Sequence, residues 1–246
     1  MLRVESTGSV LHITLDRPEV RNAFNDELIA ALTDAFRRAD ARVVVLSGEG
    51  KGFCAGGDLE WMRKAAAYTE EENLADAMKL ADLFQSIAEC PALVIARVHG
   101  ACFGGGCGLV AAADVAIASH DALFAFSEVR LGLIPGTIST HVIPRIGAGH
   151  ARALFATGEA FGSERALRIG LVHEVGDLDE LVAAKVKQAL SVGPKAVEES
   201  KRLVRDFPVP AEEAARRLAI ARASEEGREG LSAFLEKRPA AFLEST

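Results

Sequence analysis

Apolar residues follow the periods of strands and helices in turn along this chain. Positions 10–15 alternate between apolar and polar side chains, which predicts a strand with one buried face. Behind Asn25, a favourable helix N-cap, apolar residues recur at helical spacing over 28–36. An apolar run then predicts a buried strand over 42–46. Strands and helices that alternate in this way indicate an α/β fold.

The same kinds of element return in the middle of the chain. Helical spacing over 70–87 ends before Pro91, which breaks the helix and begins a strand over 92–96. After a helix of small residues, further strands are predicted at 115–118 and 123–126. Two strands and a helix therefore recur about every 50 residues, without a convincing sequence repeat.

From Gly147 onward the sequence is predominantly helical in pattern. Ser163 and Gly170 are expected to cap the two ends of one helix. Pro208 and Pro210 predict a break before two helices at 211–226 and 230–237.

The tail is too thin to enclose a core of its own. We therefore divide the chain into a core over 1–192 and a helical segment over 193–246.

Composition limits the classes of function. With 246 residues and 49% hydrophobic side chains, the chain can bury a sizeable core. A formal charge of −7 argues against a nucleic-acid or membrane-surface binder. The polar start at 1–6 does not fit a signal peptide, so we expect a cytoplasmic protein with reduced cysteines. The cysteines and histidines lack the spacing of metal sites, so no metal is expected. No cysteine has an evident base beside it in the sequence, so a catalytic cysteine is not expected either.

Two glycine-containing loops carry the candidate chemistry. Residues 53–59 follow one predicted buried strand, residues 103–108 follow another, and each loop precedes a helix. Small residues there leave backbone N–H groups open at a positive helix end, which suits negative charge that develops on an oxygen. Alternatively, the glycines only allow strands and helices to pack tightly. The triple glycine at 104–106 does not form a dinucleotide-binding fingerprint.

Three further segments, Asn22–Asn25, Ser127–Gly136 and Phe234–Pro239, complete a pattern with these loops. In order and over nearly the whole chain, the pattern resembles the enoyl-CoA hydratase/isomerase (crotonase) family. The resemblance implies a spiral of repeated ββα units with a C-terminal helical trimerisation segment, assembled as a homotrimer or as a hexamer of two trimers. It also implies an acyl-CoA thioester as substrate and no cofactor beyond the coenzyme A that the substrate carries.

The resemblance assigns three catalytic positions. The backbone N–H groups of Gly57 and Gly105 would hold the thioester oxygen, and Glu128 would move protons. Apolar neighbours of Glu128 are expected to raise its carboxyl pKa. The plain alternative for Glu128 is an ordinary ion pair with Arg130.

The resemblance also implies positions that bind the substrate. Backbone groups of residues 21–24 and 55–59 would hold the adenine and pantetheine, and Trp61 and Met62 would line the acyl pocket. Arg17, Arg21 and Lys237 are candidates for phosphate contact, although solvated basic side chains are the usual alternative. The full predicted set comprises Arg21, Ala23, Phe24, Ala55, Asp58, Leu59, Gly104, Gly108, Pro135, Gly136 and Lys237.

Position 108 departs from the family pattern. Hydratases of this family usually carry a second glutamate where this chain has Gly108. The segments around Gly104–Leu109 and Ser127–Arg130 are nevertheless closest in pattern to bacterial methylglutaconyl-CoA hydratase-like members, which favours hydration of a 2-enoyl-CoA. If the geometry were otherwise intact, a glutamate installed at 108 would be expected to increase hydration.

Several alternatives stay open at this stage. A single glutamate also suits Δ3-Δ2 isomerisation, and a decarboxylase, a thioester hydrolase or a non-catalytic acyl-CoA binder are further possibilities. Ser139, His141 and Asp114 are candidates for the missing role, although packing or pairing explains each of them as simply. Acyl-chain length and branching are not encoded in any motif.

Overall fold

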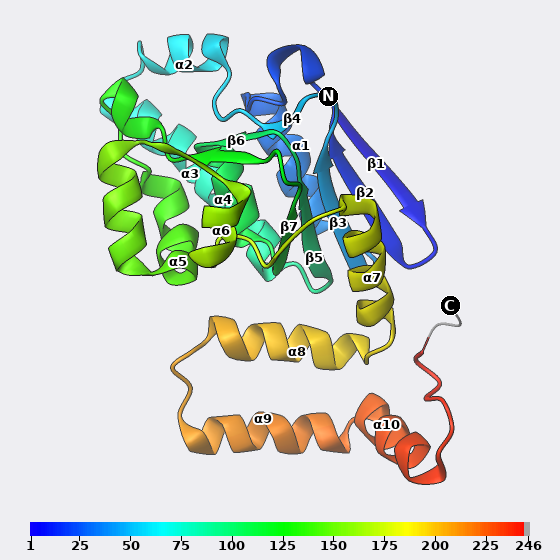
Figure 1. The fold of residues 1–246 in the computed structure, drawn as a ribbon. Coiled ribbons are helices and arrows are strands. Elements are labelled where there is room, and N and C mark those ends of the chain that lie inside the picture. The colour runs from blue at the N-terminus through cyan, green and yellow to red at the C-terminus, as the bar shows by residue number, and fades with distance from the viewer. Residues whose placement is uncertain (244–246) are drawn as a thin grey trace.

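A computed structural model, which describes residues 1–243, contains a large mixed sheet (Figure 1). Its strand order is β1-β2-β3-β5-β7-β10. Only the β1–β2 pair is antiparallel; the other neighbours are parallel. The strands are β1 (Leu2–Thr7), β2 (Val10–Leu15), β3 (Val43–Gly48), β5 (Leu93–Val98), β7 (Val115–Ala118) and β10 (Glu174–Val175).

A second, smaller sheet carries the loops of interest. Its order is β4-β6-β8-β9, with β4, β6 and β8 parallel and β9 antiparallel to β8. The strands are β4 (Gly52–Cys54), β6 (Ala101–Phe103), β8 (Leu123–Ala125) and β9 (Ala160–Gly162). Each short strand of the parallel trio follows a longer neighbour, so the chain winds as a spiral of strand–strand–helix units.

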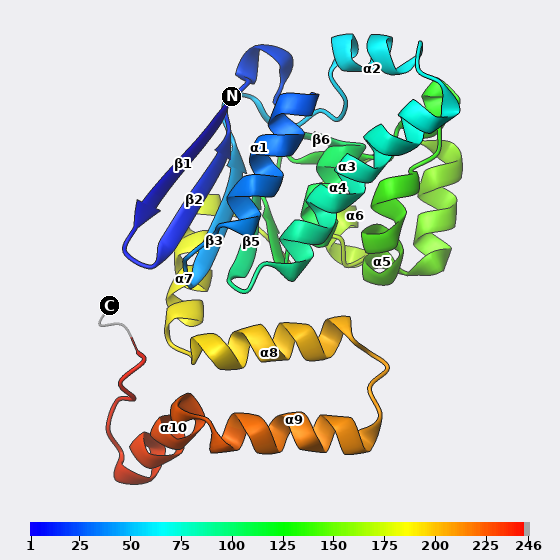
Figure 2. The ribbon, with the colours of Figure 1, turned by 180° about the vertical axis from the view of Figure 1, so that it is seen from behind.

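Helices enclose both sheets. Figure 2 shows α1 and α3 over one face of the large sheet, and Figure 1 shows α7 on the opposite side. The main core lies between the sheets and α1, α3, α4 and α5, and a smaller apolar cluster lies under α7. The elements of this part are η1 (Pro18–Val20), α1 (Asp26–Arg37), α2 (Leu59–Ala65), α3 (Glu70–Glu89), α4 (Gly105–Ala112), η2 (Glu128–Leu131), α5 (Gly136–Thr157), α6 (Ser163–Arg168) and α7 (Leu178–Leu190).

Three C-terminal helices form a separate layer below the core (Figure 1). They are α8 (Pro194–Arg205), α9 (Ala211–Ala223) and α10 (Glu225–Glu236). Lys201 on α8 joins this layer to the core, because its Nζ lies 2.6 Å from Asp114 Oδ2 and donates to the carbonyls of Cys90 and Ala92. None of the helices formed by residues 1–243 is long and apolar enough to cross a membrane.

The predicted α/β class and most central elements are confirmed, but two details of the helical region are wrong. Gly162 rather than Ser163 is the N-cap of α6, because the Ser163 hydroxyl donates to the carbonyl of His120. The long helix predicted at 211–226 ends at Ala223, where Ser224 caps α10 by accepting a hydrogen bond from Gly227. The break therefore falls at a capping serine inside the predicted helix.

Candidate active site

Three neighbouring strands of the small sheet end beside one another and supply the site. Since β4, β6 and β8 are parallel, their carboxyl ends meet at one edge of the sheet. The chain continues from β4 to Gly57, from β6 to Gly105 and from β8 to Glu128. The topology thus brings together the three residues that the sequence assigns to catalysis.

The loop around Gly57 is held by the backbone of Phe24. The N–H of Phe24 donates to Gly56 O at 2.7 Å, and the N–H of Asp58 donates to Phe24 O at 2.8 Å. This bridge leaves the N–H of Gly57 between two anchored residues, and it finds no acceptor within residues 1–243. The Gly57 N–H is therefore an open donor on a fixed loop.

A second open donor lies at the start of α4. Gly104, with φ +50°, turns the chain from β6 into the helix, and Gly105 is the first helical residue. The Gly105 N–H likewise has no acceptor in the described part of the chain. Because it heads a helix, this donor also lies at the positive end of the helix dipole.

Phe24 couples the two loops. Its ring is only 1% exposed, and a Cβ placed on Gly105 would lie 2.5 Å from its Cε2. Any side chain at 105 would therefore displace the residue whose backbone holds Gly57. The ring is thus a spacer between the donors, while the predicted ligand contact through the backbone of Phe24 remains a prediction.

An ion pair between Arg17 and Asp58 holds the loop around Gly57 in place. Arg17 Nη2 lies 2.9 Å from Asp58 Oδ2, and the side chains are 15% and 11% exposed. The other Asp58 oxygen accepts from the N–H groups of Glu60 and Trp61 and so caps α2. Burial raises the pKa of Asp58, but these hydrogen bonds and Arg17 outweigh it and hold the pKa below its ordinary value.

This arrangement gives Arg17 a structural role, while its candidate role as a phosphate contact remains a prediction. Its guanidinium is committed to Asp58 and to the carbonyl of Ala23. Arginine forms such fixed, forked contacts where a loop must be held in one geometry. Arg17 is therefore part of the support of the site.

Glu128 lies against the second loop. A Cβ on Gly104 would lie 3.2 Å from Glu128 Oε1, so a side chain at this position would crowd the carboxyl. Glu128 Oε2 is buried without a hydrogen-bond partner in residues 1–243, and those residues give Glu128 no ion pair. Burial raises the carboxyl pKa, as the sequence predicted, and the alternative ion pair with Arg130 is absent from the same residues.

Side chains of the core fill the space beside Gly108. A Cβ at this position would lie 2.6 Å from both Phe84 Cζ and Ile138 Cγ2. A glutamate here would have to displace an aromatic ring and a branched side chain. The condition of an otherwise intact geometry, on which the expected gain in hydration depends, is therefore not met at position 108.

The other candidates for a second proton-handling group are mostly committed elsewhere. Ser139 Oγ donates to the carbonyl of Gly136, and Asp114 pairs with Lys201 as the plainer interpretation predicted. His141 lies edge-on to Phe84, with ring centroids 6.2 Å apart, and burial lowers its pKa. Burial thus favours the uncharged form of His141, whose ring packs against Phe84 beside Gly108.

Of the remaining predicted ligand positions, some lie near the loops that carry Gly57 and Gly105, and others lie farther away. Arg21 is exposed in a left-handed turn, and Leu59 is 76% exposed at the start of α2. Ala23 is buried, Ala55 is half-buried, and Pro135 and Gly136 begin α5. Lys237 ends α10, which both views place at the opposite end of the molecule from α2. The roles of these residues in binding remain predictions.

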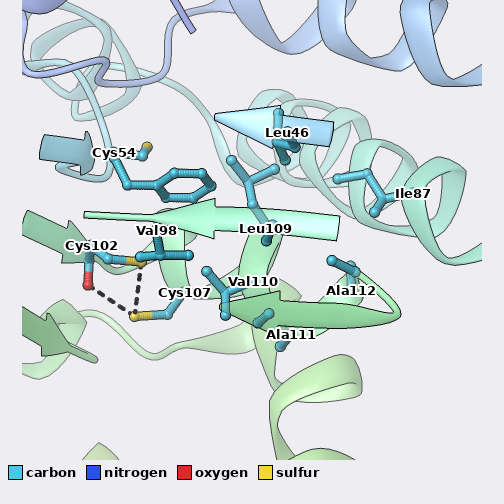
Figure 3. Close-up of a cluster of buried hydrophobic side chains, with 14 of the residues drawn as sticks. Leu46, Cys54, Ile87, Val98, Cys102, Cys107, Leu109, Val110, Ala111 and Ala112 are labelled. Atoms are coloured by element: carbon cyan, nitrogen blue, oxygen red, sulfur yellow. Dashed lines mark hydrogen bonds between the residues drawn. The ribbon is translucent and has the colours of Figure 1, made fainter. Parts of the chain in front are cut away.

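The four cysteines belong to the core. All are buried and free, and burial raises the pKa of Cys54 to about 12. Figure 3 shows Cys102 and Cys107 facing each other among apolar side chains of α4, with Cys107 Sγ 3.1 Å from the carbonyl of Cys102. Such thiols are not nucleophiles at neutral pH. Residues 1–243 contain no cluster of His, Cys, Asp and Glu that could hold a metal ion.

Sequence reasoning missed the residues that support the site. Phe84 and Ile138 follow ordinary core spacing, and nothing in the sequence connects them with Gly108. Asn22 is fully buried and ties its loop to the carbonyls of Glu49 and Gly52. An asparagine between a basic residue and an apolar run signals a turn, but not its partners. A separate cavity of about 760 Å³ lies under α7, and none of the three catalytic candidates lines it.

Comparison with known proteins agrees with this geometry. Residues 5–245 match the family model described as enoyl-CoA hydratase/isomerase. A Rhodobacter capsulatus protein named "Probable enoyl-CoA hydratase" is 38% identical, over 98% of this chain and 97% of its own length. The crotonyl-CoA hydratase of Syntrophomonas wolfei is 34% identical, over 99% of this chain and 97% of its own.

Solved structures give the same result. An enoyl-CoA hydratase from Shewanella pealeana superposes with a TM-score of 0.94 at 37% identity, and the match covers 98% of this chain and 95% of that one. Sequence and fold agree over nearly the full length, and the relatives are named as hydratases. The chain belongs to the enoyl-CoA hydratase/isomerase family of enzymes.

Proposed function

We propose that this protein hydrates a 2-enoyl-CoA thioester, with Glu128 as its single proton-transfer residue. The observation that carries the proposal is the meeting of two open N–H donors, Gly57 and Gly105, with a buried carboxyl whose Oε2 has no hydrogen-bond partner in residues 1–243. Naming of the relatives as hydratases favours hydration within the family.

The two N–H groups would hold the thioester oxygen. When a nucleophile adds to the β-carbon, the thioester becomes an enolate and negative charge moves onto that oxygen. Donors fixed by Phe24, Asp58 and the helix α4 need not reorganise as the charge develops. One donor of this kind typically contributes about 3 kcal/mol to transition-state stabilisation.

Glu128 would act twice in each turnover. Its carboxylate first takes a proton from water while the water oxygen bonds to the β-carbon and the π electrons move to the thioester oxygen. The resulting carboxylic acid then gives that proton to the α-carbon as the enolate collapses. One water is added and Glu128 returns to its starting form. A pKa raised by burial brings the two forms closer in energy near neutral pH.

The filled space at Gly108 supports a second candidate function. Phe84 and Ile138 occupy the region that a second carboxylate would need. A single carboxyl that takes a proton from the α-carbon of a 3-enoyl-CoA and returns it to the γ-carbon would perform Δ3-Δ2 isomerisation. This reaction needs no bound water.

The remaining predictions belong to the same proposal. The substrate is an acyl-CoA thioester, no cofactor is needed beyond its coenzyme A, and the protein is cytoplasmic. Segment 193–246 assembles the chain into a homotrimer or a hexamer, and Lys237 would contact the ligand of a neighbouring subunit. No nucleic acid or membrane takes part.

A panel of CoA esters tests the reaction class. Purified protein is incubated with 2-enoyl, 3-enoyl, branched glutaconyl and malonyl-type CoA esters, and the products are weighed by mass spectrometry. A 2-enoyl or glutaconyl ester that gains the mass of one water supports hydration. A 3-enoyl ester that changes its double bond at constant mass supports isomerisation instead. Binding of the whole panel without conversion would overturn both functions.

A further inference from the structure

Trp61 lies directly on one of the two open donors. A Cβ placed on Gly57 would lie 3.1 Å from Trp61 Cζ3 and 3.2 Å from Cε3. Trp61 belongs to α2, a helix with no fully buried residue that lies at the rim of the molecule in both views (Figures 1 and 2). Met62 Cγ of the same helix would lie 3.3 Å from that Cβ, so Trp61 and Met62 together pack α2 against the loop that carries the donor.

The indole nitrogen of Trp61 is buried. Trp61 Nε1 is shielded from solvent and completes no hydrogen bond within residues 1–243. A buried N–H without an acceptor is unfavourable, so an acceptor that comes within reach of Trp61 Nε1 stabilises the protein.

Such an acceptor is present on α3. Asp76 is only 8% exposed, and its Oδ1 is also buried without a hydrogen-bond partner in the described residues. Burial raises the Asp76 carboxyl pKa and repulsion by Asp26 adds to this, whereas the indole N–H of Trp61 and Lys79 lower it. The indole N–H thus lies near the Asp76 carboxyl and lowers its pKa. The two groups nevertheless do not complete a hydrogen bond.

Two other charged groups lie near Asp76. Lys79 Nζ lies 3.6 Å from Asp26 in an exposed ion pair, and the Asp26 carboxyl is close enough to hydrogen-bond with a protonated Asp76, which further raises the Asp76 pKa. Because an ionised Asp26 carries no hydrogen to donate, Trp61 is the neighbour that can donate a hydrogen bond to the ionised Asp76 carboxyl. A small movement of α2 toward α3 would satisfy both buried groups at once.

We propose that Asp76 is a positioning residue, whose carboxyl binds the indole N–H of Trp61 and thereby holds α2 and the Gly57 donor in the geometry that binds the thioester oxygen. This inference rests on the proposed role of Gly57. The hydrogen bond closes when an acyl-CoA ester occupies the site, since the ester fixes the loop on which the indole rests.

The chain offers a direct optical probe, because Trp61 is its single tryptophan. Three variants are compared with the wild type: Asp76→Leu removes the acceptor, Asp76→Asn keeps an acceptor oxygen without the charge, and Glu71→Leu alters an exposed acid of the same helix. Circular dichroism and melting curves check that each variant folds. Acetoacetyl-CoA serves as the ligand, since its acyl group forms a stable enolate that absorbs in the ultraviolet.

We expect Asp76→Leu to lower kcat for crotonyl-CoA about tenfold with KM changed less than threefold, because the donor is displaced but the coenzyme A contacts persist. Acetoacetyl-CoA should protect Trp61 from acrylamide quenching in the wild type, in Glu71→Leu and, as the conservative rescue, in Asp76→Asn. In Asp76→Leu this protection should be lost and the enolate absorption reduced. Quenching and kcat identical in Asp76→Leu and the wild type would overturn the inference, as would an Asp76→Asn variant as impaired as Asp76→Leu.

A second variant covers the case in which Asp76→Leu fails to fold. Trp61→Phe keeps a ring against Gly57 and removes the indole N–H, so it should reproduce the loss of kcat with KM little changed. A folded Trp61→Phe variant with the kcat of the wild type would contradict the inference. Quenching needs no turnover, so an enzyme that converts none of the CoA esters would disprove the proposed function and still test the contact.

Discussion

Glu128 occupies a position where stability and chemistry conflict. Burying a carboxyl without a partner is unfavourable, yet the same burial raises its pKa toward the range in which it can exchange protons near neutral pH. Such a residue is expected where a reaction needs it and is costly elsewhere.

A single substitution tests both aspects. Glu128→Gln should lower kcat by about 10³-fold through loss of proton transfer, with KM nearly unchanged. Because the folded state holds the Glu128 proton more tightly than the unfolded chain, ionisation destabilises the protein as the pH rises above the ordinary carboxyl value. The variant should therefore melt a few degrees higher than the wild type at pH 7 and lose this advantage near pH 4. Equal melting temperatures at both pH values would show that the carboxyl is not strained by burial.

Gly108 can be tested in the same way. Even a methyl group there would lie 2.6 Å from Phe84 and Ile138, so Gly108→Ala should cost about 1–3 kcal/mol of unfolding free energy. Gly149→Ala is the matched control, because a Cβ at this position of α5 meets nothing within 4 Å. Gly108→Glu should be at least as destabilised as Gly108→Ala and should gain no hydration activity. A stable Gly108→Glu enzyme with faster hydration would show that the core yields at this point.

At the scale of elements, parallel strands explain why distant segments of the chain meet. Apolar spacing predicted the elements well where a buried face was present: the strand at 115–118 has the predicted limits, and Asn25 caps α1 by accepting from Leu28. It did not predict β1, whose residues are almost all exposed and alternate between apolar and polar side chains only over its first four positions. The catalytic loops followed from motif and resemblance, but Phe24, Phe84 and Asn22 acquire their roles only through three-dimensional contacts.

The ion pair beneath α2 gives a prediction at this scale. Arg17→Met leaves the Asp58 charge largely buried and unpaired, so it should cost about 3 kcal/mol and loosen the first donor loop. We expect a lower melting temperature together with a lower kcat. Arg3→Met is the control, because the Arg3–Glu49 pair is 45% and 48% exposed and should contribute little. Equal effects of the two substitutions on melting temperature would contradict the assigned role of Arg17.

For the whole molecule, the C-terminal layer is the part that we propose to assemble with other chains. Its helices expose large apolar side chains that a lone subunit would leave in water: Val204, Phe207, Ile220, Phe234 and Leu235 are between 65% and 81% exposed. Exposed apolar surface of this extent is typical of an interface. In the sequence, the residue pattern indicated only that this tail was too thin to form its own core, and the family resemblance added the expectation of trimerisation.

Light scattering on the full chain tests the assembly. The expected mass is that of three or six chains, and Phe207→Asp combined with Phe234→Asp should reduce it. Asp121→Asn, which changes a surface charge away from these helices, should leave the mass unaltered. A wild-type protein with the mass of one chain would contradict the predicted trimerisation by segment 193–246.

The most direct test of hydration by Glu128 follows heavy oxygen from water into the product. Wild-type protein and Glu128→Gln are incubated in heavy-oxygen water with the CoA ester that the wild type converts, at matched occupancy of the site. If Glu128 carries out the hydration, each wild-type product molecule contains one heavy oxygen, and incorporation in the variant is about 10³-fold slower. Incorporation by Glu128→Gln at the wild-type rate would contradict a hydration carried out by this single carboxyl.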